Sequence, residues 1–263
     1  MNNTAVFDKD LNPILSLANN DDLEPLVSYL KTKYSESLTV SAAYKSHNPN
    51  HSKYADLIAK EIRDMGGNSF VNTFRGEGPS YFEIVCDVAS KLNAPYNKNK
   101  SISDIEDSIL ETILEKTLNK MSDADKEELM KEMGGKAGFS KGGITTAAFI
   151  TIFRAGGFRS YQLTLIIANQ IARLILGSGF RLATNTAIVR AASILSGPIG
   201  WAITGLWTAV DLAGPSYKVT IPCVIQIAML RKKLNSIICD NCDAVLSDST
   251  MKFCPECGNP VSL

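Results

Sequence analysis

Acidic residues are missing from a long stretch of this chain. From Met133 to Val210 there are 78 residues without an aspartate or glutamate, although the whole chain contains 27 of them. The same stretch carries seven basic residues, which give it a charge of +7: Lys136, Lys141, Arg154, Arg159, Arg173, Arg181 and Arg190. The net charge of the whole chain is +0, so attraction of the whole molecule to nucleic acid is not indicated.

Uninterrupted apolar runs are also scarce. The uncharged segment from Ala191 to Val210 has 20 residues, the length of a membrane-spanning helix. Pro198 interrupts this segment, and glycine, serine and threonine dilute it, so a permanent multi-span membrane protein is disfavoured. The first residues, MNNTAVFDKDLNPIL, lack the basic segment and apolar run of a signal peptide, and we therefore expect a cytoplasmic protein.

A recognisable catalytic constellation is missing as well. No triad, phosphate-binding loop or pair of carboxylates stands out, which disfavours an enzyme. The two histidines of the chain, His47 and His51, lie on either side of Pro49, and we interpret them as part of a solvated loop rather than as metal ligands. Cys86 lies in an apolar helical segment and is interpreted as a core residue.

Cysteine is concentrated near the C-terminus, where four of the six occur as Cys239, Cys242, Cys254 and Cys257. Two CxxC pairs separated by eleven residues are typical of a zinc ribbon, because four thiolates from two tight turns can surround one Zn²⁺. The span between the pairs can hold a small β-hairpin, and Gly258 supplies a permissive backbone after the last ligand. We predict one structural Zn²⁺ per chain, with no open position for catalysis.

Helix-capping patterns indicate where several helices begin. Ser80 with Glu83 and Ser103 with Glu106 each form a capping box, and Ser122 opens a further helix. In the acid-free stretch, glycines divide the chain into short helices. We expect these helices near residues 144–155, 159–176, 180–196, 198–212 and 219–236.

The charge reverses sign along the chain. Ser103–Glu132 contains ten acidic residues and four lysines, a net charge of −6, directly before the basic stretch. We therefore expect the acidic helices to pack on the basic apolar region and shield it. Exposed ion pairs contribute only ~0–1 kcal/mol each, so apolar burial must stabilise most of this contact.

Together these patterns predict a mainly α protein. We expect a multi-helix bundle with a glycine-rich apolar helical region and a small C-terminal β zinc ribbon. The predicted domains are an N-terminal helical region with the acidic helices at residues 1–135, an apolar, acid-poor helical region at 136–236 and the zinc ribbon at 237–263.

Capping and glycine motifs also follow one another in a fixed order through most of the chain. They include FDKDLNPILSLANNDDLEPLVSYL near the start, Gly66-Gly67-Asn68-Ser69, Phe74-Arg75-Gly76, Cys86-Asp87-Val88 and LEKTLNKMSDADKEELMKEMG. In these segments the chain resembles the YaaW-like family of bacterial proteins. The resemblance covers roughly residues 5 to 233 and implies no established activity, and residues 234 to 263 look like an added module.

Two non-enzymatic functions fit these observations. The first is latent interaction with membranes, as in a pore-forming stress or defence effector. The apolar helices would then reach anionic lipid through six residues: Arg159, Arg173, Arg181, Arg190, Trp201 and Trp207. Such a protein would be cytoplasmic and only conditionally membrane-associated.

The alternative is a cytosolic adaptor or chaperone-like module that docks a protein partner through its ribbon. Nucleic acid is a disfavoured partner, because the ribbon itself is acidic even though Arg231, Lys232 and Lys233 precede it.

The simplest interpretation of the apolar region is a helical core in which arginines pair with the acidic helices. The sequence leaves oligomerisation open.

Overall fold

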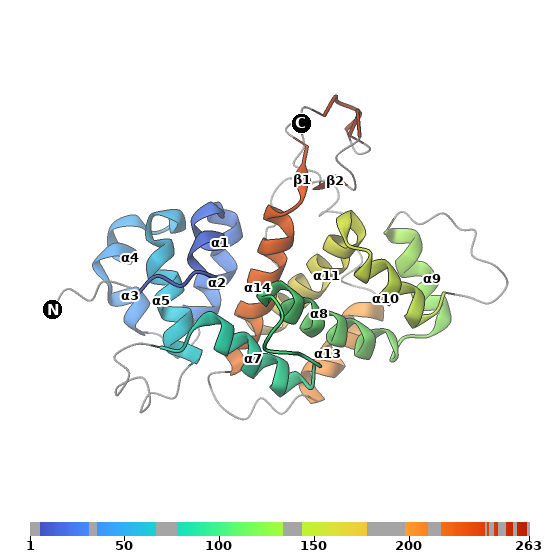
Figure 1. Cartoon of the computed structure of the whole chain (residues 1–263), viewed down its shortest axis with the longest axis horizontal. Coiled ribbons are helices and arrows are strands. Elements are labelled where there is room, and N and C mark those ends of the chain that lie inside the picture. The colour runs from blue at the N-terminus through green and yellow to red at the C-terminus, as the bar shows by residue number, and fades with distance from the viewer. Residues whose placement is uncertain are drawn as a thin grey trace. The chain divides into compact units, whose positions relative to one another are not determined.

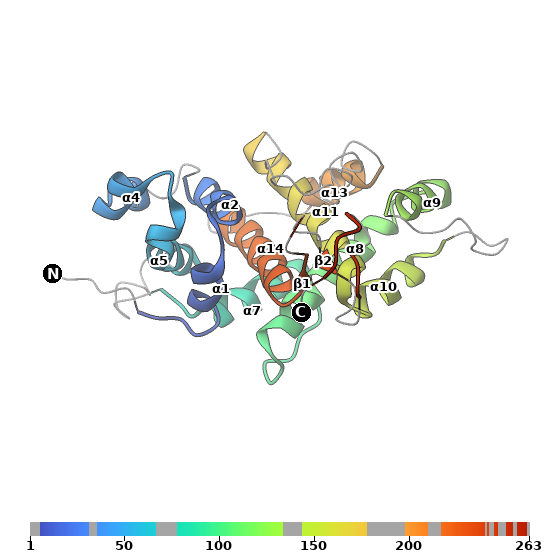
Figure 2. The same ribbon diagram turned by 90° about the horizontal axis from the view of Figure 1, so that it is seen from above.

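The computed structural model describes residues 6–31, 36–66, 78–133, 144–177, 198–209, 217–239, 241, 245–246, 251–254 and 257–261. These residues form helices and two short strands, which confirms the predicted mainly α class (Figures 1 and 2). The chain forms two compact units. Unit 1 comprises Met1–Ile109 and Asp211–Arg231, and unit 2 comprises Leu110–Val210 and Lys232–Leu263.

The boundaries between the units fall inside two helices, α8 (Ile102–Leu118) and α14 (Tyr217–Leu234). Each unit is therefore made of two segments that are distant in sequence. The three domains expected from the sequence have different boundaries, and their division remains a prediction about independently folding parts.

Unit 1 contains the N-terminal helices and most of α14. Its other elements are α1 (Asn12–Leu17), α2 (Asn20–Lys31), α3 (Glu36–Val40), α4 (Ala42–His47), the 3-10 helix η1 (His51–Tyr54), α5 (Ala55–Gly66), α7 (Tyr81–Leu92) and the first part of α8. Every residue of α14 from Val219 to Leu230 is buried, and the charged residues of this helix lie near its two ends. A helix that is apolar on all sides is expected to be enclosed by other elements, and α14 is enclosed in this way.

Unit 2 is centred on α11 (Gly157–Leu176). Within it, Ser160 to Ala172 are buried except for Gln162. Helices α10 (Thr146–Arg154) and α13 (Pro198–Ala209) pack against α11, and α9 (Asp123–Glu132) packs against α13. The helices predicted near 144–155, 159–176, 198–212 and 219–236 correspond to α10, α11, α13 and α14, whereas the helix predicted at 180–196 lies outside the described residues.

Two predicted helix starts are confirmed. Ser80 accepts a hydrogen bond from the backbone N–H of Glu83, whose side chain accepts from the backbone N–H of Ser80. Ser122 and Asp125 form the same reciprocal pair at the start of α9. Each pair satisfies two backbone donors that a helix N-terminus would otherwise leave without partners.

The predicted capping box of Ser103 and Glu106 is wrong. Helix α8 begins one residue before Ser103, and Ser101 caps it by accepting a hydrogen bond from the N–H of Asp104 at 3.2 Å. Glu106 instead lies in the core of unit 1, as described below. Ser101 and Ser103 are each followed three residues later by an acidic residue, so the sequence allows either serine to cap α8. Ser101 is the cap because Glu106, the partner of Ser103, is buried in the core.

The acidic and basic segments meet inside unit 2, which confirms one predicted contact. Arg154 at the end of α10 donates from Nε and Nη2 to the carboxylate of Glu111 on α8, at 2.8 and 2.5 Å. Thr146 at the start of α10 donates to the side chain of Asn119 at 2.9 Å. Glu111 on α8 and Asn119, directly after α8, thus bind the two ends of α10.

Gly78 packs so closely on the backbone of Arg63 that it leaves no room for a side chain. A Cβ atom at Gly78 would lie 2.5 Å from the carbonyl carbon and oxygen of Arg63. Overpacking costs typically about 1–3 kcal/mol, and we expect Gly78→Ala to lower the free energy of unfolding in urea by that amount. A Cβ at Gly205 would have only Lys120 Nζ nearby, at 3.8 Å, so Gly205→Ala is the matched control. Equal stability of the two variants would contradict this explanation.

Candidate metal centre

The C-terminal segment begins where α14 ends. Strand β1 (Ile237–Ile238) pairs antiparallel with β2 (Val245–Leu246), and Ile237 lies opposite Leu246. Cys239 directly follows β1, so the first CxxC pair belongs to the connection between these two strands. Its second cysteine, Cys242, lies outside the described residues.

A second turn follows Cys254. Phe253 and Pro260 form an isolated antiparallel β-bridge. The N–H of Cys254 donates to the carbonyl oxygen of Asn259 at 2.8 Å, and the N–H of Gly258 donates to the carbonyl oxygen of Cys254 at 2.9 Å. Gly258 has φ +73°, a left-handed conformation that glycine adopts without strain, as the sequence predicts. Strand pairing therefore flanks each CxxC pair; much of the span between the pairs, which the sequence suggests can hold a small hairpin, lies outside the described residues.

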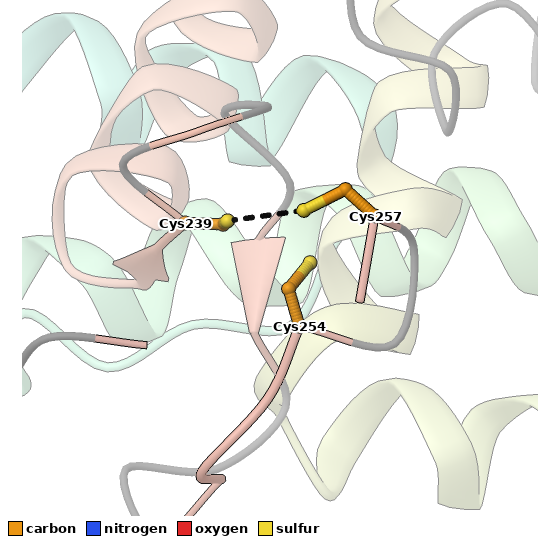
Figure 3. Close-up of side chains that lie close together, drawn as sticks. All are labelled: Cys239, Cys254 and Cys257. Carbon is orange, nitrogen blue, oxygen red and sulfur yellow. Dashed lines mark hydrogen bonds between the residues drawn. The ribbon is translucent and has the colours of Figure 1, made fainter. Parts of the chain in front are cut away.

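Three cysteine sulfurs meet between these turns (Figure 3). The Sγ atoms of Cys239, Cys254 and Cys257 all lie within 4.8 Å of one another, and those of Cys239 and Cys257 are 3.7 Å apart. A disulfide needs about 2.05 Å between sulfurs, so no disulfide joins these three cysteines to one another. Tetrahedral ligands at a Zn–S distance of about 2.3 Å lie about 3.8 Å apart. The three sulfurs could therefore hold a single metal ion.

Among the described residues, the apolar core around these sulfurs is very small. Cys239, Leu246 and Cys254 are buried, and Met251, Cys257 and Val261 pack against them. A core of this size cannot offset the conformational entropy of an ordered segment, and small modules of this kind depend on a metal or on disulfides. One metal ion held by the three sulfurs could supply the stability that this small core lacks.

The two tryptophans predicted to contact lipid lie on α13. Trp201 is 77% exposed, and Trp207 is half-buried. Helix α13 has no charged side chain, and its residues Ile199 and Ile203 are buried. In the part of the chain that the structure describes, no helix combines the length and the apolar character needed to cross a membrane.

The four arginines predicted to contact lipid have different positions. Arg159 donates from Nη1 to the carbonyl oxygen of Met133 at 2.9 Å. Arg173 is half-buried in the last turn of α11. Arg181 and Arg190 lie outside the described residues, so the structure describes four of the six predicted residues.

A buried ion pair in unit 1 was not predicted. Arg231 donates from Nε to Glu106 at 2.7 Å, and the two side chains are 13% and 2% exposed. Tyr81 donates to the other oxygen of Glu106 at 2.9 Å, and Arg231 Nη2 donates to the carbonyl oxygen of Asp10 at 2.7 Å. Burial raises the pKa of Glu106, and the hydrogen bonds from Arg231 and Tyr81 counteract part of that rise. Because these groups satisfy one another, Arg231 stabilises the fold and is not presented to a ligand.

His51 is buried, which contradicts its interpretation as part of a solvated loop. Its Nε2 atom lies 2.5 Å from a carboxylate oxygen of Glu24, and its Nδ1 atom lies 2.5 Å from the hydroxyl of Tyr54. Burial, with smaller contributions from Tyr44 and Glu24, raises the pKa of Tyr54 to about 12, so this phenol keeps its proton and can donate it to Nδ1. Both ring nitrogens of His51 have protein partners, so it crosslinks α2 and η1. Cys86 is buried, as predicted.

Comparison with known proteins finds relatives along most of the chain. A UPF0174 protein from Helicobacter pylori (strain J99 / ATCC 700824) is 43% identical over 234 residues, which are 86% of this chain and 92% of that protein. A second UPF0174 protein of the same strain is 38% identical over 206 residues, 76% of this chain and 99% of that protein. The UPF0174 protein YaaW from Escherichia coli (strain K12) is 31% identical over 211 residues, 78% of this chain and 84% of that protein. No family model and no solved structure matches the chain.

Proposed function

Since this chain belongs to the UPF0174 family, as its resemblance to YaaW-like proteins predicts, and its relatives' names state no activity, we propose its function from its own structure. It is a non-enzymatic cytoplasmic protein that carries a structural Zn²⁺ in its C-terminal ribbon. It binds anionic membrane surfaces conditionally, when acidic side chains release the basic apolar region. The exposure of Trp201 on an uncharged helix supports this function most directly.

Helix α13 has the properties of an element that enters a membrane interface. Its sequence, PIGWAITGLWTA, buries Ile199 and Ile203 and exposes the indole of Trp201. Tryptophan is enriched where membrane meets water, because its ring is apolar and its N–H is polar. A short uncharged helix with such a side chain suits shallow insertion between lipid headgroups.

The ion pair of Arg154 and Glu111 can keep this binding conditional. The Arg154 side chain is 67% exposed, so solvent screens its pairing with Glu111 and the pair stabilises the fold only weakly. A basic residue near an anionic membrane surface gains about 1 kcal/mol. Lipid headgroups and Glu111 therefore compete for Arg154 on nearly equal terms, and small changes in lipid charge or salt decide which of them binds it.

The metal has a structural role in this proposal. Cys239, Cys254 and Cys257 supply three thiolates, and Cys242 supplies the fourth. Four thiolates complete the tetrahedral coordination of one Zn²⁺ and leave no position for a catalytic water. The ion would stabilise the ribbon by joining its two turns.

Reversing two acidic charges beside Arg154 should increase membrane binding. Glu111 pairs with Arg154, and Glu115 lies one turn further along the same face of α8. In a Glu111→Lys, Glu115→Lys variant, we expect flotation with anionic liposomes to rise several-fold, because released Arg154 and two added lysines each gain about 1 kcal/mol. The rise should be largest at low salt, where screening is weak.

Matched variants separate lipid contact from a general charge effect. Asp21→Lys with Asp87→Lys makes the same charge change at exposed positions of unit 1 and should leave flotation near that of the parent. Adding Trp201→Ala to the charge-reversed variant should cancel the gain. If the charge-reversed variant stays folded and floats no better than the parent, the membrane function is wrong.

An adaptor function is the second candidate, and one observation favours it. Phe253, next to Cys254 in the second turn of the ribbon, is 62% exposed. Aromatic side chains held on a rigid scaffold are common anchors of protein interfaces. This candidate expects no change in flotation from any variant above, so the same experiment discriminates between the two functions.

A further inference from the structure

The end of α14 attaches the ribbon to the helices of unit 2. Lys232 Nζ donates to the hydroxyl of Ser160 on α11 at 3.3 Å and lies 4.8 Å from the ring centre of Phe153 on α10. The Phe153 ring is buried, so this cation–π contact covers an apolar side chain as well as binding a charge. Lys232 thus connects the start of the C-terminal ribbon to α10 and α11.

Two side-chain contacts hold the last turn of α10, in addition to its packing on α11 and the hydrogen bond of Thr146 with Asn119. Phe153 meets Lys232, and the next residue, Arg154, is bound by Glu111 on α8. The helix has only nine residues, and isolated helices of this length are unstable in water. Its order therefore depends on the neighbours that hold it, and its last turn is the point where both contacts act.

The position of Lys232 depends in turn on the ribbon. Lys232 lies in the last turn of α14, where helices fray most easily. Ser236 donates its hydroxyl proton to the carbonyl oxygen of Lys232, and β1 follows at once. Strand β2 lies beside α11. A folded ribbon therefore fixes the chain that leaves α14, and an unfolded one leaves that last turn free to open.

We infer that metal binding at Cys239, Cys254 and Cys257 controls how firmly α10 is held, through Lys232. With the metal bound, the ribbon orders the last turn of α14 and keeps Lys232 on Phe153. Without the metal, this turn frays, Lys232 leaves, and α10 loses the contact of Phe153 with Lys232. The link from the metal to α10 depends on contacts within unit 2 alone, whereas its effect on lipid binding rests on the proposed function.

Hydrogen exchange of the full chain tests this coupling. Treating the metal-loaded protein with a chelator should raise the exchange rates of α10 amides about tenfold, while α2 of unit 1 stays unchanged. Lys232→Met should raise α10 exchange by a similar factor with the metal still bound. Treating the Lys232→Met protein with the chelator should raise α10 exchange little further. Both changes remove the same contact, the one between Lys232 and Phe153. Lys218→Met, an exposed position on the same helix, is the matched control and should behave like the parent.

Two results would overturn the coupling. In one, chelation unfolds the ribbon and α10 exchange does not change. In the other, the effects of chelation and of Lys232→Met on the exchange rates of α10 amides add in full. Liposome flotation of the chelated protein is a separate readout: if α10 loosens and flotation does not rise, the coupling stands and the membrane function fails.

Discussion

Purified under reducing conditions, the chain should contain about one zinc ion, and Cys254→Ser should remove it and unfold the ribbon. Structural Zn²⁺ sites in small peptides bind with about 10–16 kcal/mol at neutral pH, far more than the few apolar side chains around Leu246 can supply. Elemental analysis measures the metal, and X-ray absorption should show sulfur ligands alone at about 2.3 Å. The helices of unit 1 should keep their far-ultraviolet circular dichroism signal.

Two further variants make this test specific. Cys242→Ser should lose the metal as Cys254→Ser does, because four thiolates are needed to close the site. Cys86→Ser changes a buried cysteine of α7 in unit 1 and should keep the metal. A reduced protein with an ordered ribbon and no bound metal would refute the zinc prediction.

Removing one partner of the buried pair of Glu106 and Arg231 should destabilise the protein by about 3–5 kcal/mol. Glu106→Gln keeps the shape of the side chain and its contact with Tyr81, but leaves the guanidinium of Arg231 without its counter-charge. Arg231→Met leaves the carboxylate of Glu106 buried with Tyr81 as its donor. Urea unfolding followed by circular dichroism measures both losses.

A double variant and an exposed pair provide the controls. Glu106→Gln combined with Arg231→Met removes both charges, so its loss of stability should be well below the sum of the single losses. Glu111→Gln breaks the exposed pair with Arg154 and should cost no more than about 1 kcal/mol. If Glu106→Gln lowers the free energy of unfolding no more than Glu111→Gln does, the buried pair does not stabilise the fold more than the exposed pair, and this prediction is wrong.

Features with a local cause could be predicted from the sequence. The pairing of Ser80 with Glu83 depends on residues three positions apart, and the structure forms it as expected. The candidate metal site has a local sequence signal because each CxxC pair fits one turn, and the three described cysteines of the four meet at a ligand-like spacing. The apolar and acid-free character of 159–176 likewise identified the central helix of unit 2.

Features that depend on distant residues could not be predicted. Glu106 fits a capping pattern, but Arg231 lies 125 positions away, and their burial in one core has no signal in the local sequence. His51 follows Pro49 in a polar segment, and its burial depends on Glu24 from another helix. The burial of α14 from Val219 to Leu230 likewise depends on residues distant in sequence, such as Asp22, whose carbonyl oxygen accepts from Gln226.

The discontinuity of unit 1 has a consequence for how the protein is made. During translation, Met1–Ile109 emerges from the ribosome first. The 101 residues of Leu110–Val210 must then be synthesised before the buried part of α14 emerges. At about 5–20 residues per second, this delay lasts about 5–20 seconds. During that time the nascent N-terminal half has no α14 to cover its apolar faces, and Glu106 has no Arg231. We therefore expect the N-terminal half to expose apolar surface during translation, and a chain truncated before Asp211 should aggregate.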